Sequence, residues 1–522
     1  MCYLCQMFDF TPLARPIFAP KIRACRSWVG NSAVVQRREL EWLLRKGLHT
    51  LIGEKYGFRS IRGYDDFASR VPVMPYGKIR GMVMDMISGG KDILWPGVTR
   101  SFAQSSGTSD GKSKYIPVTR DSFSRQHYRG GAYVVSSYLD LYPDSRLFSG
   151  KAFILGGSFS NELSGLPPGV RVGDLSANLI ANINPLANAF RVPSKDVALM
   201  SDWEEKLPAL TDAAIGQDIT NISGVPSWFL TLLRSVIAKA GASTIHDVWP
   251  NLEVFFHGGI AFGPYREQYR AITDSNKMRY LETYNASEGF FAVQTDREDS
   301  SMQLLLDAGT FYEFVPAGQA DEEFPEAVPV WKVEEGETYA LVITACNGLW
   351  RYPLGDTVTV KSVDPLKIVI AGRTKHYINA FGEELMVHNA DAAITRACGL
   401  TGAKVANYTA APVYTTGSSR GHHQWLIEFT EMPEGGLEVF ADTLDRCLQQ
   451  ENSDYQAKRT HDIFLARLKV EAACEGLFDR WLASTGKLGG QRKVPRLCND
   501  RHFIEPMLDI NRELHDMKNK NM

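Results

Sequence analysis

Short apolar runs alternate with longer helical patterns along most of this chain of 522 residues. The runs Ala152–Leu155, Leu252–Phe256 and Ile368–Ile370 have the length and the flanking sequence of β-strands. Asp121–Leu141, in contrast, is long enough and suitably patterned for a helix. Because helices that alternate with strands must cover the faces of a sheet, we predict an α/β fold.

Two local elements can be predicted in more detail. Apolar residues recur at helical spacing from about Val35 to Ile52, with charged residues on the other face, so this stretch is expected to form one helix. Met302–Leu306 and Thr310–Val315 are strand-like and flank the turn sequence Asp307-Ala308-Gly309. We expect these two runs to pair as a hairpin.

The length of the chain implies two or more domains, because single cores rarely grow to this size. The main boundary is expected just after Gly372-Arg373, where a loop carrying Gly382 leads into a helix that starts near Glu383. Strands near Val405–Tyr408 and Gln424–Phe429 and a helix near Leu437–Gln449 follow. We therefore expect a poorly ordered N-terminal segment, a large multi-layer α/β domain and a small C-terminal α+β domain, at residues 1–34, 35–378 and 379–522.

Composition argues against several classes of protein. The formal net charge of −3 comes without a basic stripe, so no nucleic-acid partner is expected. No apolar run is long enough to cross a bilayer, and the first residues lack the charged head and apolar stretch of a secretory signal. Eight cysteines in a chain this long do not suggest a disulfide scaffold, which favours the cytoplasm. Monomer and dimer both stay open.

The segment from Ser105 to Lys114 is rich in hydroxyls, glycines and lysines. Glycines let backbone N–H groups turn toward an anion, hydroxyls donate hydrogen bonds and lysines neutralise charge, so a polyphosphate suits this segment. It is not a P-loop, because the first glycine of that motif would fall on Ser106. The strand-like Tyr115–Val118 also follows where a P-loop requires a helix.

A serine hydrolase is the alternative from a different class. Gly107-Thr108-Ser109-Asp110-Gly111 matches a nucleophile elbow with Ser109 as the nucleophile, and His257-Gly258-Gly259 resembles an oxyanion-hole loop. The flanks of Ser109 do not read as a buried strand and a helix, and the oxyanion loop should come before the serine. We rank this interpretation second.

Three further motifs follow the Ser105–Lys114 segment along the chain. They are Tyr284-Asn285-Ala286-Ser287-Glu288, Arg351-Tyr352-Pro353-Leu354-Gly355-Asp356 and Gly372-Arg373-Thr374-Lys375. In this order they resemble the motifs of the adenylate-forming superfamily of acyl-CoA synthetases and luciferases. A closer resemblance is to the auxin-responsive Gretchen Hagen family of acyl-acid amido synthetases and its bacterial relatives. It is carried by Ser105–Lys114, by Gly348–Val358 and by a C-terminal stretch with Asn452–Arg459, Gly476–Phe478 and Gln491–Arg496. The resemblance spans roughly residues 35–500.

This resemblance implies that the chain binds ATP and Mg²⁺. The residues that would hold the ATP phosphates all belong to the hydroxyl-rich segment: Ser105, Ser106, Gly107, Thr108, Ser109 and Lys114. Tyr284 would stack on the adenine, beside the backbone of Gly258 and Gly259. Ser287 would reach the α-phosphate, and Glu288 would bind the metal.

The remaining roles implied by the resemblance fall on later motifs. Asp356 would accept both ribose hydroxyls, with Tyr352 in the same nucleotide-binding motif. Arg373 would mark the hinge before a mobile C-terminal domain, and Lys493 would be the lysine of that domain that reaches the reacting carboxylate. The chain departs from many superfamily members at Pro353, where they have arginine.

The activity implied is that of an ATP-dependent ligase. It would adenylate a small carboxylic acid and transfer the acyl group to the amine of an amino acid. A close alternative is transfer to the thiol of coenzyme A. A third hypothesis is a nucleotide-binding protein without catalysis.

Overall fold

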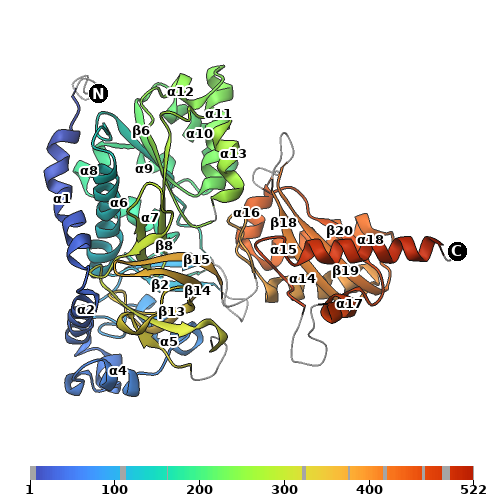
Figure 1. Ribbon diagram of the computed structural model, residues 1–522, viewed down its shortest axis with the longest axis horizontal. Coiled ribbons are helices and arrows are strands. Elements are labelled where there is room, and N and C mark those ends of the chain that lie inside the picture. Colours follow the sequence, from blue (N-terminus) through green and yellow to red (C-terminus); the bar gives the residue numbers. More distant parts are fainter. Residues whose placement is uncertain are drawn as a thin grey trace. The chain divides into compact units, whose positions relative to one another are not determined.

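A computed structural model describes residues 8–105, 113–161, 163–260, 262–319, 325–373, 377–414, 420–460, 465–484 and 494–520 (Figure 1). These residues form two compact units. Unit 1 holds the described residues up to Ser105 and from Lys114 to Arg373, and unit 2 holds Ser113 and the described residues from Tyr377 onward. Tyr377–Ile378, predicted from the sequence to end the large domain, therefore belong to unit 2. In the described parts of both units, no helix combines the length and apolar character needed to span a membrane.

A mixed sheet of 12 strands forms the centre of unit 1 as described. In sheet order the strands are β12 (Val328–Pro329), β11 (Thr310–Pro316), β13 (Thr338–Ala345), β14 (Leu349–Val363), β15 (Leu366–Arg373), β10 (Met302–Leu304), β9 (Gly289–Gln294), β8 (Arg279–Ala286), β7 (Val254–His257), β6 (Ile219–Gly224), β3 (Lys151–Ile154) and β5 (Arg191–Val192). The strands from β8 to β5 run parallel, and those from β12 to β8 pair antiparallel. The predicted α/β fold is confirmed.

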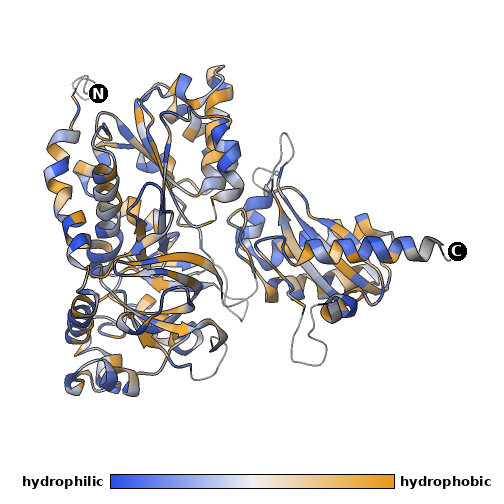
Figure 2. Cartoon of the chain, in the orientation of Figure 1, coloured by the Kyte–Doolittle hydropathy of each residue, from blue (hydrophilic) through white to orange (hydrophobic). Residues whose placement is uncertain are grey.

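Helices and short helical turns make up much of the rest of unit 1. They are α1 (Thr11–Ser27), α2 (Ser32–Gly47), α3 (Leu51–Lys55), η2 (Phe58–Ser60), α4 (Tyr64–Arg70), α5 (Tyr76–Ile87), η3 (Ser122–His127), α6 (Tyr128–Leu141), α7 (Leu175–Asn182), α8 (Pro185–Ala189), α9 (Lys195–Ala198), α10 (Trp203–Ala214), α11 (Pro226–Ala240), α12 (Ile245–Val248), η4 (Gly263–Tyr265), α13 (Arg266–Arg270), η5 (Ala317–Gln319) and η6 (Val330–Lys332). Hydrophobic residues gather on strands such as β13 and β15 (Figure 2), and β13 is buried along nearly its whole length.

A second, smaller sheet of unit 1 carries the ends of the hydroxyl-rich segment. It has three strands in the order β2 (Lys114–Pro117), β1 (Ser101–Ser105) and β4 (Arg171–Gly173). Ser105 and Lys114 are the last pair in the register of β1 with β2. The residues between them, 106–112, lie outside the described part of the chain.

The expectation of a poorly ordered start is corrected for most of residues 1–34. α1 packs along α6 (Figure 1), with Ile22 and Cys25 buried. The Arg15 guanidinium donates to Leu139 O at 2.7 Å, and Ile22 N donates to Ser136 Oγ at 3.0 Å. Apolar burial and long-range hydrogen bonds therefore hold this segment as a helix.

The single helix predicted for Val35–Ile52 is instead two helices, α2 and α3. Thr50 is extended and caps α3, because its hydroxyl accepts a hydrogen bond from Gly53 N. The chain turns so tightly here that a Cβ at Gly53 would lie 1.9 Å from Gly47 O. Glycine at position 53 permits the break.

The predicted hairpin of Met302–Leu306 with Thr310–Val315 is wrong. β10 pairs with β9 and β15, whereas β11 pairs with β12 and β13. The Gln36 side chain of α2 takes the place of hairpin hydrogen bonds, since its Nε2 donates to Leu306 O at 2.7 Å and to Thr310 O at 2.9 Å. Two strands that are close in sequence thus separate into different parts of the sheet.

Unit 2 is a three-stranded sheet with helices and a small hairpin. Its elements are β16 (Tyr377–Ile378), β17 (Leu385–Met386), α14 (Val387–Thr401), β18 (Lys404–Val413), β19 (His422–Glu431), α15 (Leu437–Glu451), α16 (Ser453–Arg459), β20 (Lys469–Ala473), α17 (Leu477–Ser484) and α18 (Ile504–Lys520). Phe478, Ile504 and Met507 belong to its core. The expected helix start near Glu383 is corrected to Val387, because the buried Glu383 carboxylate accepts hydrogen bonds from Ala380 N and Phe381 N in the hairpin turn.

Candidate functional site

The carboxyl ends of the parallel strands β6, β7 and β8 lie side by side in unit 1. In open α/β sheets this edge is where ligands bind. Gly258 and Gly259 directly follow β7 there. A Cβ at Gly258 would lie 2.4 Å from Thr283 O, and Gly259 has a φ of +84°, a conformation that favours glycine. Gly258 therefore lets this backbone approach β8 closely, and Gly259 lets the chain turn directly after it.

The turn between β8 and β9 carries Ser287 and Glu288. The Glu288 carbonyl accepts hydrogen bonds from Asn347 Nδ2 at 2.9 Å and from Gln126 Nε2 at 3.5 Å. Asn347 lies in the turn between β13 and β14. The turn that carries Glu288 therefore docks against the hairpin that carries the next motif.

Tyr284 and Asp356 meet although 72 positions separate them in the chain. The Tyr284 hydroxyl donates to Asp356 Oδ2 at 2.6 Å, and both side chains are buried. The Tyr284 ring also packs on Phe291, with 5.1 Å between ring centroids. Hydrogen bonds to a charged acceptor are stronger than neutral ones, so Tyr284 orients this carboxylate as well as presenting a ring.

Tyr352 and Lys114 form a second contact beside the same hairpin. Lys114 Nζ donates to the Tyr352 hydroxyl at 3.3 Å and lies 5.8 Å from the centre of the ring. Because Lys114 also pairs with Ser105, both ends of the hydroxyl-rich segment lie close to Tyr352. In the register of β14 with β15, Asp356 lies opposite Arg373.

The structure thus brings together most of the predicted site residues that it describes. One chain of contacts or adjacent positions joins Ser105, Lys114, Gly258, Gly259, Tyr284, Ser287, Glu288, Tyr352, Asp356 and the backbone of Arg373. Ser106, Gly107, Thr108 and Ser109 lie outside the described residues, as does Lys493. The elbow proposed for a hydrolase at Ser109 is therefore outside the described residues too.

Arg351 makes structural contacts within unit 1. Its Nη2 and Nε donate to the buried Glu313 carboxylate, the closest contact being 2.9 Å. Its Nη1 donates to Ala68 O at 2.9 Å and to Val71 O at 2.7 Å. These bonds hold Arg351 at a φ of +43°, which is unusual for a residue with a side chain. Arg351 therefore anchors the start of β14.

His257 is a feature of this region that the sequence motifs did not single out as a binding residue. Its side chain is 3% exposed, and Nδ1 has no hydrogen-bond partner among the described residues. Burial lowers the pKa of His257 to about 3, so the ring is neutral near pH 7. Its position directly before Gly258 was the available sequence signal.

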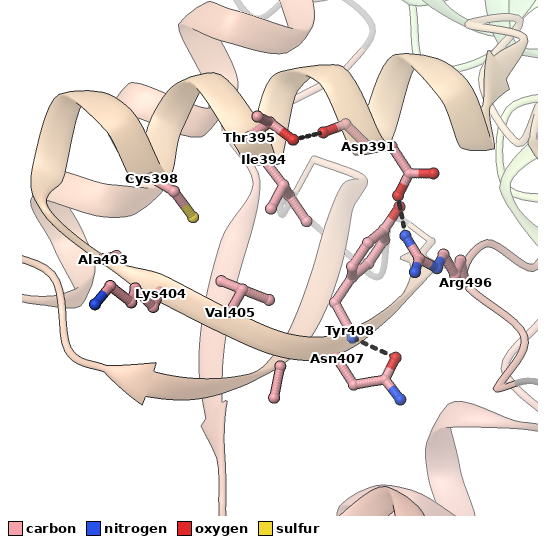
Figure 3. Close-up of a pocket in the computed structure, with 11 residues that line it drawn as sticks. Asp391, Ile394, Thr395, Cys398, Ala403, Lys404, Val405, Asn407, Tyr408 and Arg496 are labelled. Atoms are coloured by element: carbon pink, nitrogen blue, oxygen red, sulfur yellow. Dashed lines mark hydrogen bonds and ion pairs between the residues drawn. The ribbon is translucent and has the colours of Figure 1, made fainter.

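A cavity of about 380 Å³ lies in unit 2 between α14 and β18 (Figure 3). Tyr408 donates to Asp391 Oδ1 at 2.8 Å, and Arg496 forms an ion pair with the same carboxylate. Thr409 Oγ1 donates to Pro495 O at 2.6 Å. The chain just after residue 493 is therefore held against β18, but the cavity contains none of the predicted site residues.

Family models match three parts of the chain. The GH3 family N-terminal domain matches residues 22–278, the GH3 family central domain matches 303–373, and the GH3 family C-terminal domain matches 388–502. The indole-3-acetic acid-amido synthetase GH3.8 of Oryza sativa subsp. indica is 23% identical, over 93% of this chain and 91% of the relative. The indole-3-acetic acid-amido synthetase GH3.3 of Arabidopsis thaliana is 22% identical, over 93% and 92%.

Two solved structures have a similar fold. The AtGH3.15 acyl acid amido synthetase in complex with 2,4-DB has a TM-score of 0.59 at 16% identity, covering 94% of this chain and 95% of that one. A 2-hydroxyisobutyryl-CoA ligase in complex with 2-HIB-AMP and CoA has a TM-score of 0.53 at 14% identity, covering 93% and 92%. The fold is therefore the one that these two ligases share. The three family models together match most of the chain and show that it belongs to the GH3 family.

Proposed function

We propose that this protein uses ATP to adenylate a carboxylic acid and then transfers the acyl group to the amine of an amino acid. The contact of Tyr284 with Asp356 carries the proposal, because it joins two motifs that are distant in the sequence at one edge of the sheet. The proposal is supported by relatives that are named for the same class of reaction, the indole-3-acetic acid-amido synthetases.

The first half-reaction must bring two anions together. A carboxylate oxygen of the acid attacks the α-phosphorus of ATP, a new P–O bond forms, and pyrophosphate leaves. Two unit charges 4 Å apart repel by about 4 kcal/mol at an effective dielectric of 20. Lys114 and the hydroxyls of Ser105–Ser109 and Ser287 would offset this repulsion around the phosphates, while Asp356 would hold the ribose.

Glu288 is the residue that we propose to hold Mg²⁺. A hard cation takes oxygen ligands, and Mg²⁺ in nucleotide sites commonly uses one or two carboxylates together with phosphate oxygens. Within the described residues no group of three or more acidic, histidine or cysteine side chains could hold a metal ion. A single carboxylate that shares the ion with the nucleotide fits this donor set, and the ion would neutralise charge on the phosphates.

In the second half-reaction the amine nitrogen attacks the acyl carbon, an amide bond forms, and AMP leaves with the bonding electron pair. The same adenylate could pass to a thiol, and the fold shared with a CoA ligase keeps coenzyme A as the alternative acceptor. We propose that the protein works on small-molecule substrates in a reducing cytoplasm. In support, the six cysteines that the structure characterises are all free thiols.

Pyrophosphate release across a panel of carboxylic acids tests the first step. We expect release that depends on the acid, and with the right amino acid a matching amide product. Coenzyme A in place of amino acids separates the two acceptors. If no acid stimulates pyrophosphate release, the chain is a nucleotide-binding protein without this activity. Loss of activity on labelling Ser109 with a fluorophosphonate would favour the hydrolase instead.

Two variants test the proposed roles. Glu288→Gln should lower the rate of adenylation at least 100-fold, because it removes the proposed metal ligand with little change of shape. Glu335→Gln, the same change at an exposed position of unit 1, is the matched control and should retain the wild-type rate.

Lys493→Ala should impair adenylation but leave ATP binding largely intact. A Lys493→Ala variant with unchanged kinetics would remove that lysine from the proposal.

A further inference from the structure

The cavity between α14 and β18 in unit 2 has no role in the proposed reaction. Its volume of about 380 Å³ is within the range of small-molecule sites. Asp391, Ile394 and Cys398 line it from one face of α14, because they follow one another at spacings of three and four residues. Val405 and Tyr408 line it from β18. Figure 3 shows the side chains of both elements on either side of this space.

Two opposite charges lie side by side in the lining of this cavity. Arg496 Nη1 forms an ion pair with Asp391 Oδ1, which also accepts a hydrogen bond from the Tyr408 hydroxyl at 2.8 Å. The other carboxylate oxygen, Oδ2, accepts no hydrogen bond from the part of the chain that the structure describes. A guanidinium has further N–H donors besides those on Nη1. The Asp391 side chain is 44% exposed and that of Arg496 43%, so both can meet a ligand.

The rest of the lining is mainly apolar. Ile394 and Ala403 are buried, and Val405 is half-buried between the helix and the strand. Lys404, the other cation in the lining, forms an ion pair with Glu431 on β19. The cavity therefore combines an apolar surface with one pair of opposite charges.

We propose that this cavity binds a free α-amino acid with an apolar side chain. Such a molecule carries an ammonium and a carboxylate on one carbon atom, so Asp391 Oδ2 can accept from the ammonium while Arg496 donates to the carboxylate. The ligand side chain packs on Ile394 and Val405. Exposed ion pairs contribute little to stability, so Asp391 and Arg496 adjust around the ligand at low cost. The inference goes beyond the proposed function, in which an amino acid serves only as the acceptor.

Cys398 makes binding in this cavity measurable in the intact protein. Its thiol lines the cavity and is partly exposed, so iodoacetamide can alkylate it. Mass spectrometry of the Cys398 peptide gives the rate of alkylation, with no ATP or carboxylic acid present. L-leucine, L-valine and L-phenylalanine are the probes. At ten times its dissociation constant, a bound amino acid should slow the alkylation roughly tenfold, because only the free protein reacts.

Analogues of leucine test the two charges separately in the wild-type protein. N-acetyl-leucine lacks the ammonium group, and leucinamide lacks the carboxylate. Each analogue loses a charge-assisted hydrogen bond, so each should need a concentration roughly tenfold higher or more for the same protection. If both analogues protect Cys398 as well as leucine does, the cavity takes apolar molecules in general and the proposal is overturned.

Asp391→Asn assigns the protection to the charged pair. The change keeps the shape of the side chain but removes the charge that faces the ammonium, so it should weaken protection by leucine roughly tenfold or more. Asp442→Asn is the matched control, because Asp442 forms an exposed ion pair with Arg467 elsewhere in unit 2. It should bind leucine as the wild type does. Equal protection in Asp391→Asn and the wild type contradicts the proposal.

These outcomes are independent of the proposed ligase activity. A protein that adenylates an acid, but whose Cys398 reacts at the same rate with and without all three amino acids, overturns this inference and leaves the function standing. Protection of Cys398 in a protein that releases no pyrophosphate with any acid supports the amino-acid site and overturns the function.

Discussion

At the scale of single residues, the side chains of the predicted motifs hold one another in position. Tyr284 holds the carboxylate of Asp356, and Lys114 contacts the hydroxyl of Tyr352. Each pair joins residues from distant parts of the chain. A motif residue here therefore has two tasks, since it orients a neighbour before it contacts a ligand.

Tyr284→Phe separates these two tasks. The ring remains, but Asp356 loses a hydrogen bond from a hydroxyl at 2.6 Å. Bonds to charged groups contribute about 1.5–3 kcal/mol, so we expect the KM for ATP to rise roughly tenfold or more. Pyrophosphate release at varied ATP concentration measures this change. Tyr312→Phe, which also removes a buried hydroxyl, is the control, and equal KM values for the two variants would contradict the orienting role.

At the scale of elements, sequence periodicity predicted helices and strands but not their partners. β3, β7 and β15 lie where apolar runs predicted strands. The predicted hairpin of β10 with β11 is wrong because β10 pairs with the preceding strand β9 and the distant strand β15, while Gln36 of α2 bonds to the chain between β10 and β11. The break between α2 and α3 depends on a backbone contact of Gly47 with Gly53, which helical spacing does not encode.

The candidate site was predictable where the chemistry requires particular residue types. The spacing of Tyr284, Glu288 and Asp356 in their motifs was enough to group them. His257 could not be recognised in this way, because its lack of a partner depends on Phe262 and Phe255, which pack against it only in the fold. Burial and unpaired atoms are properties of the three-dimensional structure.

Arg351 ties the β13–β14 hairpin to α4, and its loss should loosen this element. Arg351→Met leaves the Glu313 carboxylate buried without its partner, although Tyr64 still donates to it at 3.0 Å. Breaking a buried ion pair on one side costs about 3–5 kcal/mol. We expect urea unfolding to show a loss of this size and the KM for ATP to rise, because Tyr352 and Asp356 follow on β14.

The double variant Arg351→Met/Glu313→Leu is the control for that ion pair. It removes both charges, so it should recover part of the stability lost in Arg351→Met. A double variant less stable than Arg351→Met, or a single variant within 1 kcal/mol of wild type (roughly the value of a surface pair), would show that the hairpin does not depend on this contact.

At the scale of the whole molecule, buried histidines decide how acid should affect unit 1. Unit 1 contains buried neutral histidines: burial lowers the pKa of His127 to about 4 and that of His257 to about 3. The pKa of His246 is also lowered by burial, and its Nδ1 accepts a hydrogen bond from Asp274 N, which protonation would break. Eight of the ten tryptophans lie in unit 1, so tryptophan fluorescence reports mainly on this unit.

These histidines predict that unit 1 loses stability between pH 7.5 and pH 5. An unfolded histidine titrates near pH 6.5, so in this window the unfolded state binds more protons than the folded state. The free energy of unfolding therefore falls as the pH is lowered. For His127, whose folded pKa is about 4, the loss by pH 5 is on the order of 2 kcal/mol. Urea unfolding followed by tryptophan fluorescence measures this loss.

His127→Leu should flatten the pH dependence of the free energy of unfolding by about the loss assigned to His127. His515→Leu, the same change at an exposed position of α18, should leave it unchanged. An unchanged slope in His127→Leu would mean that this histidine takes up its proton over the same pH range in the folded and the unfolded protein.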